Sequence, residues 1–105
     1  MANAHRGEVS AFLDGERRTL CLTLGALAHL EEALGADDLM ALAERFAHGR
    51  MKAQDAIAII GAGLRGGGTD VSDADVAKMA VEGGAAGYVT IVSDLLTATF
   101  GSSDT

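Results

Sequence analysis

The chain has almost no aromatic side chains, with three Phe, one Tyr and no Trp among its 105 residues. Ala, Leu, Ile, Val and Met must therefore fill the core, although the hydrophobic share of 49% is ordinary for a globular protein. Small side chains let helices approach closely, so this composition favours packed helices over a wide β-sandwich. The length predicts one domain, residues 1–105, with flexible tails at 1–6 and 102–105.

The scarcity of cysteine and the lack of long apolar stretches argue against disulfides and membrane-spanning helices. Cys21 is the single cysteine and cannot form an internal disulfide. No stretch approaches the roughly 20 apolar residues of a membrane-spanning helix, and the first eight residues lack the apolar core of a signal peptide. These absences predict a cytoplasmic protein.

Basic residues are scarce as well, with eight Lys and Arg against 15 Asp and Glu, for a net charge of -7. Nucleic-acid binding needs a surplus of basic side chains on one face, and these eight are scattered along the sequence. The same charge disfavours anionic membrane surfaces. We therefore expect no nucleic-acid or membrane partner, whereas a basic protein partner remains compatible with the charge.

Two alternating segments around Asp14-Gly15 predict a β-hairpin near the N-terminus. Apolar Val9, Ala11 and Leu13 alternate with Glu8, Ser10 and Phe12 in the first segment, and Leu20 and Leu22 alternate with Thr19 and Cys21 in the second. Because the second segment opens with polar residues at 16–18, the pattern leaves room for a loop longer than two residues.

Two helices are predicted after the hairpin, each ended by a glycine. Thr23 caps the first, which Gly35 ends and whose apolar face carries Leu27, Leu30 and Leu34. The second begins at Asp37 or Asp38, stops at Gly49 and buries Leu39, Leu42, Ala43 and Phe46.

Three further helices are predicted in the second half of the chain. Gln54 or Asp55 opens the first of them, which precedes a glycine loop at 66–69 and carries Ile57, Ile60 and Leu64 on one face. Ser72 and Asp75 resemble a capping box and start a short helix that carries Val76 and Met79 as far as Gly83-Gly84. Residues 88–92 have β-type composition, yet a helix over 85–100 explains more positions, namely Tyr88, Val92, Leu95, Leu96 and Phe100.

The sequence therefore predicts an α+β fold that is mostly α: an N-terminal β-hairpin followed by about five short helices in one small bundle-like domain. No internal repeat or linker divides it.

One signature suggests an enzyme, the G-x-G-x-x-G spacing of Gly61, Gly63 and Gly66. In a dinucleotide-binding fold these glycines follow a strand and open a helix whose N-terminus holds the pyrophosphate. Here the residues before the run have helical periodicity, and more glycine follows it. We therefore interpret the run as the thin end of a helix that packs closely at Gly61 and Gly63 and frays at Gly66.

The remaining candidates for chemistry are isolated. His5, His29 and His48 pair with no other ligand at metal-binding spacing, and Cys21 is expected to be a buried, inert thiol in a strand. Asp70, Asp73 and Asp75 lack the glutamate that a calcium-binding EF-hand loop requires at its twelfth position, which is Val81 here. The sequence thus predicts no enzyme and no catalytic, cofactor or metal residues, and it leaves the partner-binding residues unknown.

Several stretches resemble a short protein family encoded in alphaproteobacterial gene transfer agents, which are phage-like particles that package host DNA. The matching stretches are NAHRGEV (3–9), LDG (13–15), LTLGAL (22–27), AERF (43–46), AGLRGG (62–67) and the end from Leu95 to Gly101. Their order and spacing cover nearly the whole chain. The resemblance carries no catalytic or cofactor residues that could be transferred to positions here.

The resemblance implies a role in building a phage-type tail, either as a tail tube protein or as a tail assembly chaperone. Tail tube subunits are usually β-rich because sheets continue between neighbours in the ring, and a chain with one hairpin would make a poor tube wall. We therefore favour a chaperone that binds tape-measure or tail tube protein in the bacterial cytoplasm. A structural subunit in the particle is the alternative, and a nucleotide-binding module that uses the run from Gly61 to Gly66 is a remote one. The oligomeric state is not specified by the sequence.

Overall fold

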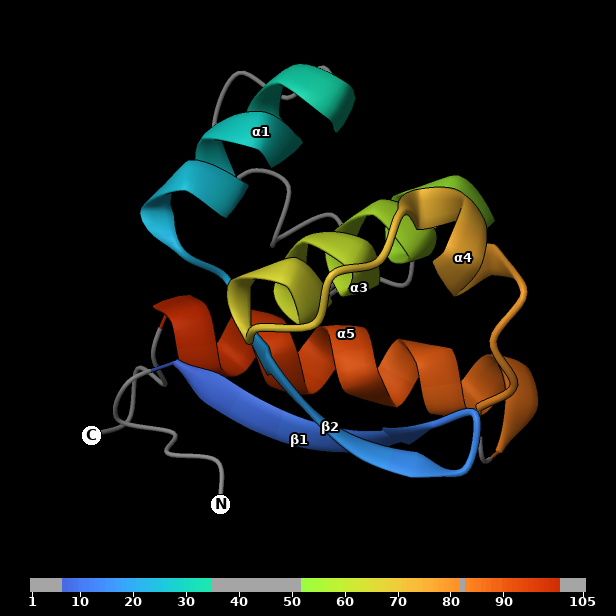
Figure 1. Cartoon of the computed structure of the whole chain (residues 1–105). Coiled ribbons are helices and arrows are strands. Elements are labelled where there is room, and N and C mark those ends of the chain that lie inside the picture. The colour runs from blue at the N-terminus through green and yellow to red at the C-terminus, as the bar shows by residue number, and fades with distance from the viewer. Residues whose placement is uncertain (1–6, 35–51, 82, 101–105) are drawn as a thin grey trace.

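The computed structural model describes residues 7–34, 52–81 and 83–100 (Figure 1). In chain order these residues form β1 (Glu8–Leu13), β2 (Glu16–Cys21), α1 (Leu24–Leu34), α3 (Ala53–Gly66), α4 (Asp73–Ala77) and α5 (Gly84–Phe100). The predicted hairpin followed by helices is confirmed. The described residues contain four helices rather than about five, because the helix predicted from Asp37 or Asp38 to Gly49 lies outside them.

The hairpin has a two-residue turn at Asp14-Gly15, and not the longer loop that the sequence left open. β1 and β2 pair antiparallel with Leu13 opposite Glu16, and the turn residues Asp14 and Gly15 both have positive φ, 58° and 79°. Such a turn matches the twist of the strands on either side. The polar residues after it remain in the strand: Arg17 lies 5.7 Å from the centre of the Phe12 ring, and Arg18 pairs with Glu16 at 3.1 Å.

The predicted cap of α1 is present. The Thr23 hydroxyl accepts a hydrogen bond from the backbone N–H of Ala26 at 3.1 Å, and the Thr23 carbonyl accepts one from Leu27 at 2.9 Å. Leu30 is buried and Leu27 is partly buried against the core, as expected. The last residue of α1 is Leu34. The glycine predicted to end this helix, Gly35, lies outside the described residues.

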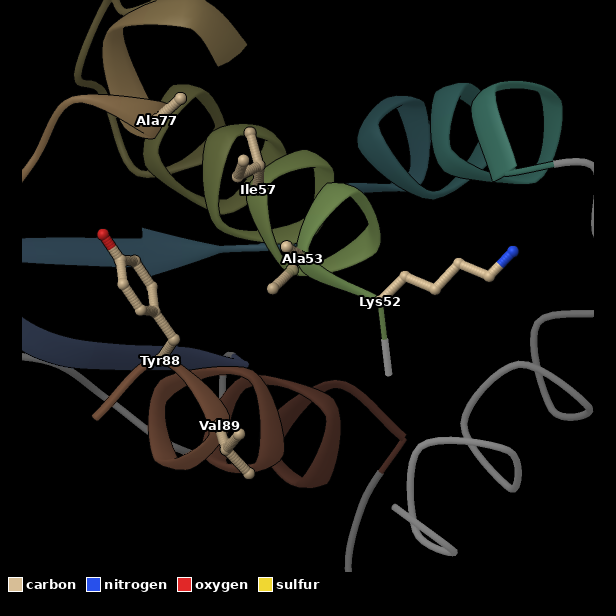
Figure 2. A pocket seen from close by; sticks show the side chains of 7 residues that line it. Lys52, Ala53, Ile57, Ala77, Tyr88 and Val89 are labelled. Atoms are coloured by element: carbon tan, nitrogen blue, oxygen red, sulfur yellow. The ribbon is translucent and has the colours of Figure 1, made fainter. Parts of the chain in front are cut away.

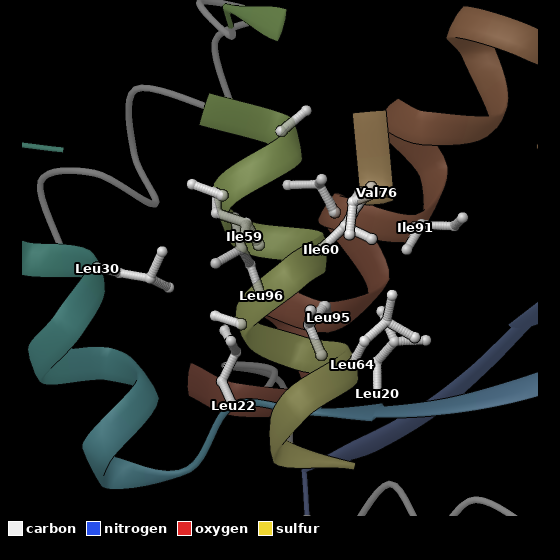
Figure 3. Close-up of a cluster of buried hydrophobic side chains, with 14 of the residues drawn as sticks. Leu20, Leu22, Leu30, Ile59, Ile60, Leu64, Val76, Ile91, Leu95 and Leu96 are labelled. Atoms are coloured by element: carbon white, nitrogen blue, oxygen red, sulfur yellow. The ribbon is translucent and has the colours of Figure 1, made fainter. Parts of the chain in front are cut away.

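α3 is the central helix of the fold and packs against β2, α1, α4 and α5 (Figure 3). It begins at Ala53, one residue before the expected start, with Lys52 in extended conformation ahead of it. Ile60 and Leu64 are buried as predicted and Ile57 partly so, but Ile59 and the small residues between them are also buried. A helix that is buried on nearly all sides explains why its sequence is mainly Ile, Ala and Gly.

α4 begins at the predicted capping box but ends earlier than predicted. The Ser72 hydroxyl accepts from the Asp75 N–H at 3.1 Å, and the Asp75 carboxylate accepts from the Ser72 N–H at 3.0 Å. The helix ends at Ala77, not at Gly83-Gly84. The reason is a contact with the hairpin: Asp14 donates to the Ala80 carbonyl at 2.7 Å, and Val81 forms a bridge with Leu13.

α5 confirms the choice of helix over strand for the last segment. Val92, Leu95 and Leu96 are buried and Tyr88 is partly buried, all on the face toward α3 and the hairpin. The hairpin lies beneath α5 in Figure 1, and α3 lies above it. No helix among the described residues is long and apolar enough to cross a membrane. The tail at 102–105 lies outside the described residues.

Candidate functional site

The glycine run 61–66 lies in the C-terminal half of α3 and ends that helix. The backbone N–H groups of Gly61, Gly63 and Gly66 therefore point back into the helix, whereas a pyrophosphate site needs free N–H groups at a helix start. At Gly63 an added Cβ would lie 2.7 Å from Leu95 Cδ2 and 3.2 Å from Leu20 Cβ. The predicted role in close packing is confirmed at this position.

Gly66 and Gly67 lie against the backbone of β2, so the prediction of a frayed end at Gly66 was wrong. A Cβ at Gly66 would overlap the Cys21 carbonyl oxygen, and one at Gly67 would overlap that of Thr19. Hydrogen-bonded pairs alternate along an antiparallel hairpin, so from the register these two carbonyls point away from β1. The end of α3 thus covers the outer edge of β2.

Two of the acidic residues after the glycine loop, Asp73 and Asp75, accept hydrogen bonds from other residues of this chain. The Arg65 guanidinium donates to the Val71 carbonyl at 3.0 Å and to Asp73 Oδ1 at 3.1 Å, which ties α3 to the start of α4. The pKa of Asp75 lies below its ordinary value, chiefly because the backbone N–H of Ser72 donates to this carboxylate. Capping and pairing account for two of the three carboxylates that suggested a calcium loop.

Among the other candidates, the two described ones, His29 and Cys21, lie on different elements. His29 is exposed on α1, beside a shallow depression that also borders Arg65 and Asp73. Cys21 ends β2 and is partly buried rather than fully buried. His5 and His48 lie outside the described residues. Within the described part of the chain, no group of three or more His, Cys, Asp or Glu side chains could hold a metal ion.

An apolar groove of about 370 Å³ lies where the starts of α3 and α5 meet the end of α4 (Figure 2). Its lining is mostly aliphatic, with one tyrosine, and consists of Ala53, Ala56, Ile57, Ala77, Tyr88 and Val89, with Lys52 at the border. The Tyr88 hydroxyl donates to the Met79 carbonyl at 2.6 Å, which fixes the ring in the groove wall and satisfies its polar end. Val89 remains 51% exposed, so the groove presents apolar surface to solvent.

The outer face of the hairpin carries a second exposed apolar side chain. Phe12 is 50% exposed and borders a small depression with Gly15, Ala80 and Val81. The Arg17 side chain lies over its ring. Aromatic side chains, Phe included, and arginine are enriched in protein–protein interfaces relative to the rest of the surface. Leu24, at the start of α1, is the third large apolar side chain exposed in the described residues, at 84%.

Sequence reasoning missed the groove because its lining comes from three helix ends that are far apart in the chain. Periodicity identifies the buried face of each helix, but it does not show which helix ends meet. No local pattern in the sequence could have identified the groove, because its lining is set by contacts between distant helix ends.

The described residues thus offer surfaces suited to binding other proteins. In a comparison with known proteins, a family model described as "Phage tail tube protein, GTA-gp10" matches residues 6–102. No curated protein and no solved structure matches the chain.

Proposed function

Since the chain belongs to the family of phage tail tube proteins of gene transfer agents, we propose that it is a non-enzymatic tail assembly chaperone. In this role it binds tape-measure or tail tube protein in the host cytoplasm before the tail polymerises. Its functional residues are then surface residues that contact protein. No catalytic, cofactor or metal site takes part.

The observation that carries this proposal is that the outer edges of both hairpin strands are partly covered by other parts of the chain. A tube wall formed by sheets that continue between subunits needs open strand edges. Here the end of α3 covers the outer edge of β2 at Thr19 and Cys21. Near the turn, the outer edge of β1 meets Ala80 and Val81. A two-stranded sheet with both edges partly covered favours a helper protein over a wall subunit.

The surface composition supports binding to another protein. Three large apolar side chains are exposed in the described residues, on the hairpin, on α1 and on α5. The net charge of -7 suits a partner with basic segments, because opposite charges speed association and select orientation.

Co-expression with the tape-measure protein, and separately with the tail tube protein, tests the proposal. We expect at least one of them to co-purify with the tagged chain through size-exclusion chromatography. An unrelated acidic helical protein with the same tag is the control. If neither tail protein co-purifies better with this chain than with the control, the proposal is wrong.

A second candidate function is a structural subunit that remains in the finished tail. The description of the matching family as a tail tube protein favours it. The two functions differ in where the chain is found after assembly, because a chaperone leaves the particle and a subunit stays in it.

A further inference from the structure

The outer edge of β1 around Ser10 offers backbone groups that pair with nothing in the described part of the chain. We infer that this edge binds an extended segment of the partner as a third strand, antiparallel to β1, with a carboxylate opposite Phe12. The inference rests on the proposed binding function. It adds the surface on this chain and the chemistry of the segment that binds there.

The backbone groups of Ser10 point away from β2. Ser10 lies opposite Thr19, and the alternation that starts at the turn makes this a pair without hydrogen bonds. The N–H and carbonyl of Ser10 and the N–H of Phe12 are therefore directed to the outer edge of β1. No described residue bonds to these three groups, and Ser10 is exposed. Unpaired groups along a strand edge are a template for one more strand, so the occupant that fits is an extended segment.

The side chains of β1 determine the alternation of that segment. Val9 and Ala11 face the core and are partly buried against it, whereas Ser10 and Phe12 are exposed on the other face. Directly opposed side chains of paired strands lie on the same face of the sheet. A third strand therefore needs apolar side chains on the core face, where they extend the contacts of Val9 and Ala11, and polar side chains on the exposed face.

A cation on the exposed face adds a requirement for negative charge. Phe12 lies opposite Arg17, whose guanidinium carbon is 5.7 Å from the centre of the phenyl ring. Arg17 thus reaches over β1 toward the next strand position, which is about 4.8 Å further out. Neither ion pair among the described residues includes Arg17. A carboxylate opposite Phe12 would form a charge-assisted hydrogen bond with this guanidinium.

Carboxylates of the described chain near Arg17 are engaged or distant. Glu16 forms an ion pair within β2 at 3.1 Å, and the Asp14 carboxylate accepts a backbone N–H of the segment after α4 at 3.1 Å. Glu8 lies on the same face as Phe12 but about 13 Å along the strand, at roughly 3.3 Å per residue. Exposed charges interact strongly only within about 8 Å at physiological salt. The partner's carboxylate therefore does not compete with an ion pair of Arg17 in the described chain.

A second copy of the chain fits this edge poorly. Of the two strands, α5 packs mainly against β1, and Figure 1 shows the hairpin beneath this helix. In a symmetric pair joined through β1, the two α5 helices would lie over strands about 4.8 Å apart, whereas packed helices need about 8–10 Å between their axes. A partner segment that brings no helix over its own strand avoids this conflict. Because the end of α3 covers β2, the sheet does not also grow on that side.

A capped peptide in which valine alternates with threonine, with glutamate in place of one central threonine, tests the inference. N-methylation removes backbone donors and leaves the side chains unchanged. In the antiparallel arrangement the threonine and glutamate N–H groups face β1. Methylating them should weaken binding to the full chain at least about tenfold, while methylating the valine amides should change it less than about twofold.

NMR shift changes on binding of the unmethylated peptide are expected at Ser10 and Phe12. No binding of this peptide at millimolar concentration overturns the inference, as does a larger loss from methylating the valine amides. Dilution-dependent shifts at Ser10 without peptide also overturn it, because they would show that a second copy occupies the edge.

Substitutions at two exposed positions locate the site on the chain. Ser10→Pro removes the outward N–H and leaves the hairpin ladder intact, since proline is tolerated on an edge strand whose N–H faces solvent. It should weaken peptide binding about tenfold, whereas the matched control Ser10→Ala keeps the N–H and should bind within about twofold of wild type. Equal binding by the two folded variants overturns the inference. If Ser10→Pro does not fold, the methylated peptides decide.

Arg17→Gln tests the charge requirement. Wild-type chain should bind the glutamate peptide about threefold more tightly than the same peptide with lysine at that position, and Arg17→Gln should remove this preference. Equal affinity of wild-type chain for the two peptides, or a preference that survives in Arg17→Gln, overturns the assignment of a carboxylate opposite Phe12.

Co-purification separates this inference from the proposed function. If a tail protein co-purifies with Ser10→Ala but not with Ser10→Pro, both are supported. If it co-purifies equally with the two variants, the function stands and the edge of β1 is the wrong surface. If neither tail protein co-purifies with wild-type chain while the peptide binds at β1 with the expected methylation pattern, the edge stands and the partner assignment is wrong.

Discussion

Hydrogen in place of a side chain at Gly66 and Gly67 allows the end of α3 to lie directly on the backbone of β2. At Gly61 the constraint is weaker, because an added Cβ would meet the Asp73 side chain, which can move. At Gly63 it would meet Leu95 and Leu20 in the core. The cost of a methyl group is therefore expected to rise from Gly61 through Gly63 to Gly66.

Gly66→Ala should lower the free energy of unfolding by about 2–3 kcal/mol, since backbone must shift to admit the methyl group. Urea unfolding followed by circular dichroism measures the change. Gly25→Ala is the matched control in α1, where the Cβ meets only the Thr23 hydroxyl at 3.9 Å. It should stabilise the chain by up to about 1 kcal/mol through helix propensity. Equal stability of Gly66→Ala and wild type would contradict the close approach.

The capping box of α4 should give a pH-dependent contribution to stability. The pKa of Asp75 is lowered in the folded chain, chiefly by the Ser72 N–H. The contribution is therefore present above the ordinary aspartate pKa and is lost as the pH falls through the lowered value. Carboxyl carbon shifts of Asp75 should titrate below the ordinary range, and the Ser72 amide shift should follow them. In Asp75→Asn that amide response should disappear, and its persistence would mean that another group titrates there.

At the scale of elements, the hairpin and the segment after α4 form one unit. Asp14 donates its N–H to the Ala80 carbonyl, and its carboxylate accepts from the Ala80 N–H at 3.1 Å. This pair of bonds ends α4 early and brings Met79 to Tyr88. The turn therefore helps to position one wall of the apolar groove.

Asp14→Ala should destabilise the chain by about 1–2 kcal/mol, because alanine disfavours positive φ and cannot accept from Ala80. Asp14→Asn should lie within about 0.5 kcal/mol of wild type, since asparagine tolerates this backbone conformation and offers a carbonyl acceptor. Hydrogen exchange at the Ala80 amide, together with urea unfolding, measures both effects. A loss in Asp14→Asn as large as that in Asp14→Ala would contradict this account, because it would assign the effect to the charge of the carboxylate.

Elements determined by neighbouring residues could be predicted from the sequence. Asp14-Gly15 forms the predicted turn, and Thr23 caps α1. Ser72 and Asp75 cap α4. The helical spacing of Val92 and Leu95 correctly predicted that α5 is a helix. Features that depend on contacts between distant residues could not be predicted. These are the early end of α4, the cover on β2 at Gly66, and the groove formed by three helix ends.

At the scale of the whole molecule, an acidic chain whose hairpin edges are partly covered presents apolar side chains at separate places on its surface. The central helix α3 connects these features: its start borders the groove, its middle fills the core, and its glycine end covers β2. This arrangement is consistent with a protein that binds others rather than one that extends a sheet into a ring.

Quantitative mass spectrometry of purified gene transfer agent particles tests the assembly role most directly, with the producing cells measured in parallel. The chaperone proposal predicts that the chain is abundant in the cells, that deleting its gene prevents tail formation, and that finished particles contain far less of it than of tail tube protein. A chain present in finished particles at the same copy number as the tube subunit would contradict the proposal and assign it to the tail structure.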